Sequence, residues 1–214
     1  MIFRKSDVRK KGLTRGWELM LSHDVKHGNT TGYCKGTSSS DIVDCIKHLK
    51  ACVLQIGHPL LLPIIIFSHD MSSKTDIKQR ETRDWLRRLE NAVSMRMEID
   101  EREGYVNKEG VVDLDAINRD LVECHSQVLW KRPKAYLEIL VGVEDAMKKF
   151  YVKLPEDRMS DPQTRKLHAS MLARLDFYRN KLQGIESYAH VTLARLDIQR
   201  SAVSLAFSIR PHLC

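Results

Sequence analysis

The strongest constraint on the fold is a seven-residue repeat of mostly apolar side chains that runs from Met171 to Val203. Asp161 can cap a helix ahead of it, and Pro162 suits a first helical turn. A repeat sustained over this length is the sequence condition for knobs-into-holes packing and left-handed supercoiling. It consists of Met171, Leu175, Tyr178, Leu182, Ile185, Ala189, Thr192, Leu196, Gln199 and Val203. We predict one long terminal helix with an interaction seam at Leu175, Leu182, Ile185, Leu196 and Val203.

The two halves of this seam differ in composition. The first half is large and apolar, whereas the second half, from Ala189 onward, is smaller and more polar. The preceding helices can cover Leu182 and Ile185, and we expect both in an intramolecular bundle. We expect the far end, with Leu196 and Val203, to be exposed or to self-associate.

Helical periodicity also covers most of the chain from residue 40 onward. Four segments carry it, and they span residues 40–56, 72–103, 113–132 and 134–154. Their predicted buried faces are Ile42, Ile46, Leu49, Val53 and Ile56; Ile77, Trp85, Leu86, Leu89, Val93 and Met97; Leu114, Ile117, Leu121, Val128 and Leu129; and Tyr136, Leu140, Val143, Met147 and Phe150. The predicted caps are Ser40 or Asp41 for the first segment and Asp113 for the third, and Pro133 ends or kinks the third. The fold class predicted is all-α, with long antiparallel helices and a coiled-coil-like C-terminal helix.

The most apolar stretch, from Pro59 to Phe67, is too short to cross a membrane, because a spanning helix needs about 20 apolar residues. Pro63 fits a first helical turn, where a missing N–H is tolerated. We predict that the stretch enters a buried helix and that Leu61 and Ile65, one turn apart, lie in the core.

Residues 1–38 differ from the rest of the chain. They carry +5 of the formal net charge of +7 and five of the ten glycines. "GWELML" suits a short strand, and "GNTTGYCKGTSSS" is typical of a loop. We therefore divide the chain into a basic, poorly ordered segment (1–38), a helical domain (39–205) and an irregular tail (206–214). The nearly balanced charge of the long helical part argues against specific nucleic-acid binding.

Two motifs with metal-ligand spacing have simpler explanations. "HDVKH" at 23–27 resembles a zinc-protease motif with Asp in place of Glu, but "GNTTG" follows and is a poor helix, so an exposed loop is favoured. Cys45, His48 and Cys52 share a helical face that can present them to zinc. Because no second ligand pair follows, buried structural cysteines are favoured there. Cys124 and His125 are neighbours on a helix and point apart, so they do not pair for catalysis.

The remaining chemistry is sparse. No phosphate-binding glycine loop or catalytic serine or cysteine signature is present, so we do not expect an enzyme. We expect no cofactor beyond weakly bound Mg²⁺ at acidic residues that close the second helical segment, although a solvated helix face explains them as well. These candidates are Glu98, Asp100, Glu101 and Glu103. Trp85 and Trp130 are expected as core anchors. The odd, scattered set of five cysteines and the lack of a signal peptide indicate a cytoplasmic protein.

Three segments resemble the cytosolic part of fungal proteins related to the CorA-type magnesium transporters. They are "HPLLLP", "RDWLRRLE" and the terminal "RLDFYRNKLQGIESYAHVTLARLDIQRSAV". In those relatives an HPLLLP-like entry precedes long helices, and a stalk helix with a segment like "LDIQRSA" leads to two membrane spans. This sequence has neither the spans nor the family's Gly-Met-Asn signature. Two explanations are open: the homologue is naturally short, or the gene model ends early. The chain itself is therefore not expected to conduct ions.

The resemblance implies a non-catalytic cytosolic helical domain that assembles, senses cations or regulates. The alternative is a helical coiled-coil adaptor or scaffold that binds a protein partner through its last helix. We expect a homo-oligomer or a helical protein partner in either case.

Overall fold

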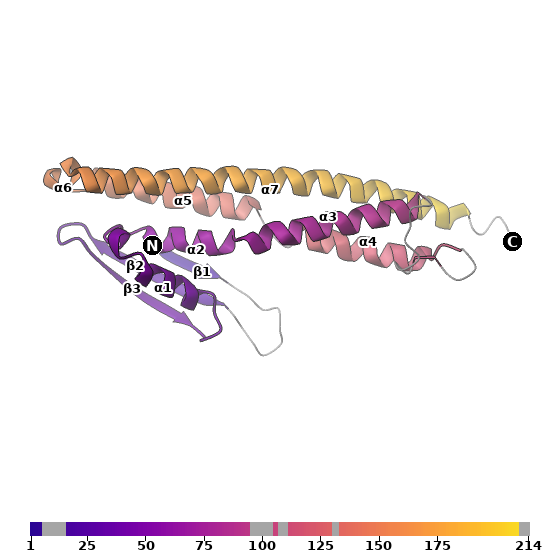
Figure 1. Ribbon diagram of the computed structural model, residues 1–214, viewed down its shortest axis with the longest axis horizontal. Helices are drawn as coiled ribbons and strands as arrows, with labels where there is room; N and C mark the ends of the chain where they lie inside the picture. The colour runs from indigo at the N-terminus through magenta and orange to yellow at the C-terminus, as the bar shows by residue number, and fades with distance from the viewer. Residues whose placement is uncertain (6–15, 95–104, 107–110, 130–132, 210–214) are drawn as a thin grey trace. The chain divides into compact units, whose positions relative to one another are not determined.

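The computed structural model describes residues 1–5, 16–94, 105–106, 111–129 and 133–209 (Figure 1). The chain forms two compact units, each built from two stretches of sequence. Unit 1 comprises Met1–Ser72 and Leu137–Asn180, and unit 2 comprises Ser73–Tyr136 and Lys181–Cys214. The structure is mainly helical, but a small antiparallel sheet in unit 1 corrects the prediction of a purely all-α fold.

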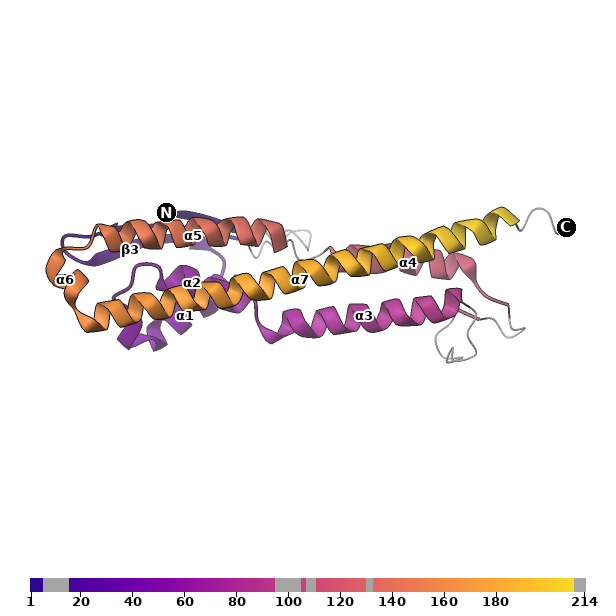
Figure 2. The same cartoon turned by 90° about the horizontal axis from the view of Figure 1, so that it is seen from above.

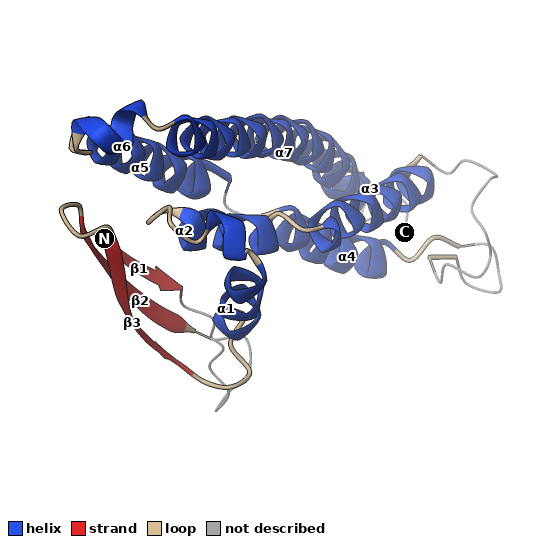
Figure 3. Ribbon diagram, turned by 60° about the vertical axis from the view of Figure 1, so that its left-hand side comes forward, coloured by secondary structure: helices blue, strands red, loops and turns tan. Residues whose placement is uncertain are grey.

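The sheet of unit 1 contains the strands β1 (Ile2–Lys5), β2 (Trp17–Asp24) and β3 (Asn29–Gly36), drawn red in Figure 3. The strand predicted in "GWELML" is confirmed, since Trp17 and Leu19 are buried and alternate with exposed neighbours. The predicted loop at 28–40 is wrong over Asn29–Gly36, where β3 pairs with β2 along its whole length, and is confirmed over residues 37–40. A turn joins these strands, and Gly28 adopts the positive φ of 72° that favours glycine. The segment 1–38 therefore contains ordered strands.

Helix α1 (Ile42–Ala51) and the short 3₁₀ helix η1 (Val53–Gln55) follow the sheet. The helix is shorter than predicted, and its buried face is Ile42 and Cys45. Val53 and Ile56 are exposed, which corrects their assignment to the core, because the α-helix ends before them and its periodicity no longer directs them inward. Asp41 precedes α1 without a side-chain cap and bonds to β1 instead.

Helix α2 (Leu61–Asp70) contains the most apolar stretch of the chain. Leu61 and Ile65 are 1% and 2% exposed, so their predicted place in the core is confirmed. Pro63 lies in the first turn, as predicted. Every residue from Leu61 to Phe67 is buried, which explains why this helix is apolar on all sides.

An ion triad that the sequence does not reveal ties β1 to α1 and α2. The Lys5 ammonium donates to Asp41 Oδ2 at 2.7 Å and to Asp70 Oδ1 at 2.8 Å. Burial on its own lowers the pKa of Lys5, but its hydrogen bonds to the two carboxylates outweigh that effect and leave the pKa raised. The triad therefore holds the first strand against the helices with its charges compensated.

Unit 2 is built from α3 (Ser73–Val93), α4 (Leu114–Val128) and the second part of α7 (Pro162–Ile209), with the first residues of α5 (Pro133–Val152). Figures 1 and 2 both show α3 and α4 alongside this part of α7. The core joins Leu86 and Leu89 of α3 to Ile117 and Leu121 of α4.

The boundaries of the helices in this unit agree with two sequence predictions. Asp113 caps α4 by accepting from the Ala116 N–H at 2.9 Å, as predicted. Pro133 lies at a helix boundary, as its lack of an N–H requires.

Among the described residues of unit 2, two members of the predicted buried faces are exposed. Ile77 is 51% exposed, because Thr75 and Thr82 occupy the buried face of α3 in its place. Leu129 is also exposed, because α4 ends at Val128 and the helical period no longer directs the next residue inward. Both findings correct the assignment of these residues to the core.

The first half of α7 and most of α5 belong to unit 1, where the five-residue helix α6 (Glu156–Ser160) connects them. Asp161 caps α7 by accepting from the backbone N–H and the hydroxyl of Thr164, both at 2.8 Å. Leu140, Val143 and Met147 of α5 are buried as predicted. At its other end α7 continues to Ile209, so the predicted irregular tail is helical over 206–209.

Candidate functional site

The predicted seam of α7 is a buried face of the helix. Leu175, Leu182 and Leu196 are at most 1% exposed, and Ile185 and Val203 are 6% and 2% exposed. Placing the first half of the seam in the intramolecular core is therefore confirmed.

The expectation for the far end is wrong. Leu196 and Val203 belong to the same core cluster as Leu86 and Ile117, because α3 and α4 cover this part of α7. These two residues are not exposed, and their burial leaves them unavailable for a separate surface.

Polar contacts fix this half of α7 within unit 2. Arg195 makes a bidentate pair with Glu90 of α3, with Nε donating to Oε1 at 2.8 Å. The hydrogen bonds to Glu90 raise the pKa of Arg195. Lys181 donates to Asp76 at 3.0 Å. Bidentate geometry gives orientation as well as energy, so α7 is held in one rotation about its axis.

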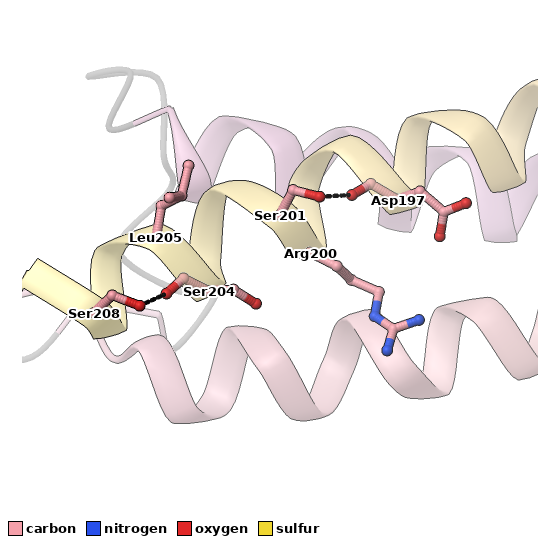
Figure 4. Close-up of a pocket in the computed structure, with 6 residues that line it drawn as sticks. All are labelled: Asp197, Arg200, Ser201, Ser204, Leu205 and Ser208. Atoms are coloured by element: carbon pink, nitrogen blue, oxygen red, sulfur yellow. Dashed lines mark hydrogen bonds between the residues drawn. The ribbon is translucent and has the colours of Figure 1, made fainter.

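A groove lies on the exposed side of the same helix (Figure 4). Its volume is about 650 Å³, and the described residues that line it are Asp197, Arg200, Ser201, Ser204, Leu205 and Ser208. All six come from α7. The hydroxyls of Ser201 and Ser208 donate to the carbonyls of Asp197 and Ser204, four residues earlier, at 2.9 and 3.0 Å. Leu205 is 65% exposed. We call this surface the α7 groove.

A second candidate is a cluster of rings in unit 1. His58 is buried and stacks on His168 of α7, with ring centroids 5.6 Å apart. Phe150 of α5 meets His58 and His23 edge-on, at 5.1 and 5.2 Å. Tyr151 stacks on His168 at 4.4 Å. We call these five residues the histidine cluster.

Hydrogen bonds assign the tautomer of His58. The Leu60 N–H donates to Nδ1 at 3.2 Å, so Nδ1 carries no proton. Nε2 therefore carries the proton and donates to Nδ1 of His168 at 3.4 Å. Burial, reinforced by the neighbouring His168 and His23, lowers the pKa of His58 to about 4. Burial also lowers the pKa of His168. Both shifts favour the neutral form of the rings.

A small pocket of about 190 Å³ opens beside this cluster in unit 1. Leu21, Leu60 and Phe150 give it an apolar floor, and Lys149 and Lys153 add two cations. His23 and Thr30 also line it, and their side chains are hydrogen-bonded to each other at 2.8 Å.

The two motifs with metal-ligand spacing, for which a loop and structural cysteines were favoured, are placed as follows. "HDVKH" ends a strand and forms the hairpin turn, where Asp24 accepts from the Lys26 N–H at 2.9 Å. Burial raises the pKa of the Cys45 thiol to about 12. His48 turns instead to His69 of α2, with Nδ1 and Nε2 3.2 Å apart. Over the described part of the chain, no three His, Cys, Asp or Glu residues lie together as a metal site would require.

The remaining predicted residues are placed as follows. Glu98, Asp100, Glu101 and Glu103 lie outside the described residues, as does Trp130. Trp85 packs on the core of unit 2, and its indole N–H donates to the Tyr105 hydroxyl at 3.4 Å. That hydroxyl donates in turn to Asp120 at 2.6 Å.

Comparison with protein-family models, with curated proteins and with solved structures gives no match. In the ranges that the structure describes, none of the helices has both the length and the apolar character needed to cross a membrane.

Proposed function

We propose that this chain is a non-catalytic helical domain of the kind found in the cytosolic part of CorA-like magnesium transporters. The observation that supports this most is α7, a continuous helix from Pro162 to Ile209 with a buried seam along its length. Two of the resembling motifs also lie in packed positions. "HPLLLP" leads into α2 through the buried Leu60 and Leu61, and "RDWLRRLE" supplies Leu86 and Leu89 to the core of unit 2.

In this proposal the domain senses divalent cations or regulates a partner, and it conducts no ions itself. Carboxylates that keep Mg²⁺ partly hydrated need no rigid cage, so the acidic residues Glu98, Asp100, Glu101 and Glu103 are the proposed contact. In the sequence they follow the end of α3 at Val93 by five to ten residues, and Glu90 of that helix is bound to α7.

The test is hydrogen exchange of the full chain with Mg²⁺, with Ca²⁺ and with K⁺ at matched ionic strength. We expect Mg²⁺ to protect amides near the end of α3. Replacing the four acidic residues by their amides should abolish that protection. A control variant with the amides at Glu81, Asp115, Glu138 and Asp145 removes the same charge and should keep it. Protection that is equal with K⁺, or that survives in the first variant, would contradict cation sensing.

The second candidate function is a helical adaptor that binds a protein partner through α7. The α7 groove favours it, because this surface is exposed and includes the apolar Leu205. An adaptor requires no response to Mg²⁺. Absence of any cation-specific protection, together with loss of partner binding when the groove is altered, would favour the adaptor over the sensor.

A further inference from the structure

The exposed side of α7 carries a second heptad repeat that the proposed function does not use. Its positions alternate by three and four residues and are all exposed. They are Gly184, Ser187, Val191, Ala194, Ile198, Ser201, Leu205 and Ser208. The apolar members recur every seven residues, and Val191, Ile198 and Leu205 are 57%, 65% and 65% exposed. We call these eight residues the outer seam, and the α7 groove covers its last third.

A repeat of seven on an open face has the pattern of a surface that packs against another helix. Scattered exposed apolar residues are ordinary on protein surfaces, but three in one register are not scattered. The serines fit such a contact as well. Because Ser201 and Ser208 already donate to carbonyls of their own helix, burying them leaves no unsatisfied hydroxyl donor.

From these observations we propose that the outer seam binds a second copy of this chain, with the two α7 helices antiparallel. Size selects the orientation. The larger residues occupy one seam position of the heptad and the small residues Ser187, Ala194 and Ser201 occupy the other. In a parallel pair Ile198 meets Ile198 and Ser201 meets Ser201, whereas an antiparallel pair can set Val191 against Ala194 and Ile198 against Ser187. Large against small fills the layers evenly, which close packing requires.

Charge selects the register. In one antiparallel register Val191 lies opposite Ala194 of the second copy, and Ile198 lies opposite Ser187. Asp197 of each copy then lies beside His190 of the other copy. The imidazole N–H can then donate to the carboxylate. Sliding one helix by a heptad in one direction brings Asp197 against Asp197, which like-charge repulsion disfavours. Sliding it in the other direction brings His190 against His190 and removes its carboxylate partner. A parallel pair brings His190 beside Arg195 and leaves Asp197 opposite Ala202.

The proposal is tested by sedimentation equilibrium of the full chain, with circular dichroism as the check on folding. The chain should form a dimer at about 100 µM or below. Ile198→Asp and Ser201→Arg should each weaken the dimer at least tenfold and leave helicity unchanged. The matched control is Val122→Asp on α4, which places the same charge at another exposed apolar position (53%, against 65% for Ile198) and should leave the dimer intact.

Orientation and register are tested by charge exchange. Asp197→Lys and His190→Glu should each weaken the dimer about 2–10-fold. The first removes the carboxylate that accepts from the imidazole, and the second sets two carboxylates together. The double variant should restore it, since the introduced lysine and glutamate then attract across the axis. A wild-type chain that stays monomeric at about 100 µM overturns the proposal, and so does a dimer indifferent to Ile198→Asp. Failure of the double variant to recover overturns the antiparallel register.

This outcome is separable from the proposed function. Dimerisation through the outer seam does not depend on Mg²⁺ or on the four acidic residues. A cation response without a dimer leaves the sensor proposal standing and removes this one. A dimer without a cation response supports this proposal and contradicts the sensor proposal.

Discussion

Acidification should destabilise the folded chain through His58. In the folded state the pKa of this residue is about 4, against 6.5 for an unperturbed histidine, because the ring is buried beside His168. Between about pH 6.5 and pH 4, His58 is mostly protonated in the unfolded chain and mostly neutral in the folded chain. Stability from this group is therefore complete above pH 6.5 and decreases as the pH falls toward 4. Between pH 7.5 and pH 4.5 the loss is about 2.5 kcal/mol.

The hydrogen bond that Nδ1 of His58 accepts also opposes protonation of the ring in the folded chain. A proton on Nδ1 of His58 would face the Leu60 N–H, so a donor would meet a donor. The variant His58→Asn keeps an acceptor for that N–H but cannot be protonated in this range. It should be less stable than the wild type at pH 7.5, because it loses the ring stack.

Urea unfolding of both proteins between pH 7.5 and pH 4.5 measures the effect. Other groups titrate in both proteins, including His168 and His23, so the relevant quantity is the difference between the two pH profiles. That difference should shrink by about 2.5 kcal/mol on acidification. Parallel profiles would show that His58 has the same pKa in the folded and unfolded chains, and the argument from its burial would be wrong.

The remaining predictions concern packing and are measured by urea unfolding. Leu182→Asp and Leu196→Asp should both unfold the chain, because each buries an unpaired carboxylate; survival of either fold would contradict full burial. Leu61→Ala should cost about 2–5 kcal/mol, and a wild-type midpoint would refute its core position. Asp70→Asn should lower the free energy of unfolding by about 1–3 kcal/mol, because it leaves Lys5 with one carboxylate. The control Asp44→Asn breaks an exposed pair with Lys47 and should lower it by less than about 1 kcal/mol. Equal losses would mean that the half-buried triad contributes no more than a surface pair.

Helices with a sustained period were predictable from the sequence, because every turn repeats the same signal. The caps Asp113 and Asp161 were also local and correctly predicted. Strand β3 was missed because glycine, asparagine and threonine between 29 and 36 are typical of turns. What makes this segment a strand is its pairing with β2, a tertiary effect that propensity does not contain.

The errors at Val53 and Ile56 arose where a helix ends early, and no local residue marks the change strongly. The ion triad of Lys5, Asp41 and Asp70 joins residues up to 65 apart in the sequence, and no spacing rule reveals such a contact. The candidate sites also differ in whether a local sequence pattern reveals them. Periodicity pointed to α7, whereas the histidine cluster is assembled from distant segments.

The outer seam shows how one helix can carry two sequence signals at once. Its apolar positions were visible in the sequence, since Val191, Ile198 and Leu205 are seven residues apart. They were overshadowed by the larger repeat through Leu196 and Val203, and the sequence alone did not tell which repeat faces inward. Burial decides this, because Leu196 is fully buried while Ile198, two residues on, is 65% exposed. A helix that satisfies one seam within its own unit and leaves a second open has the surface that an assembly helix requires. Aspartate at these neighbouring positions should therefore separate folding, which Leu196 controls, from association, which we assign to Ile198.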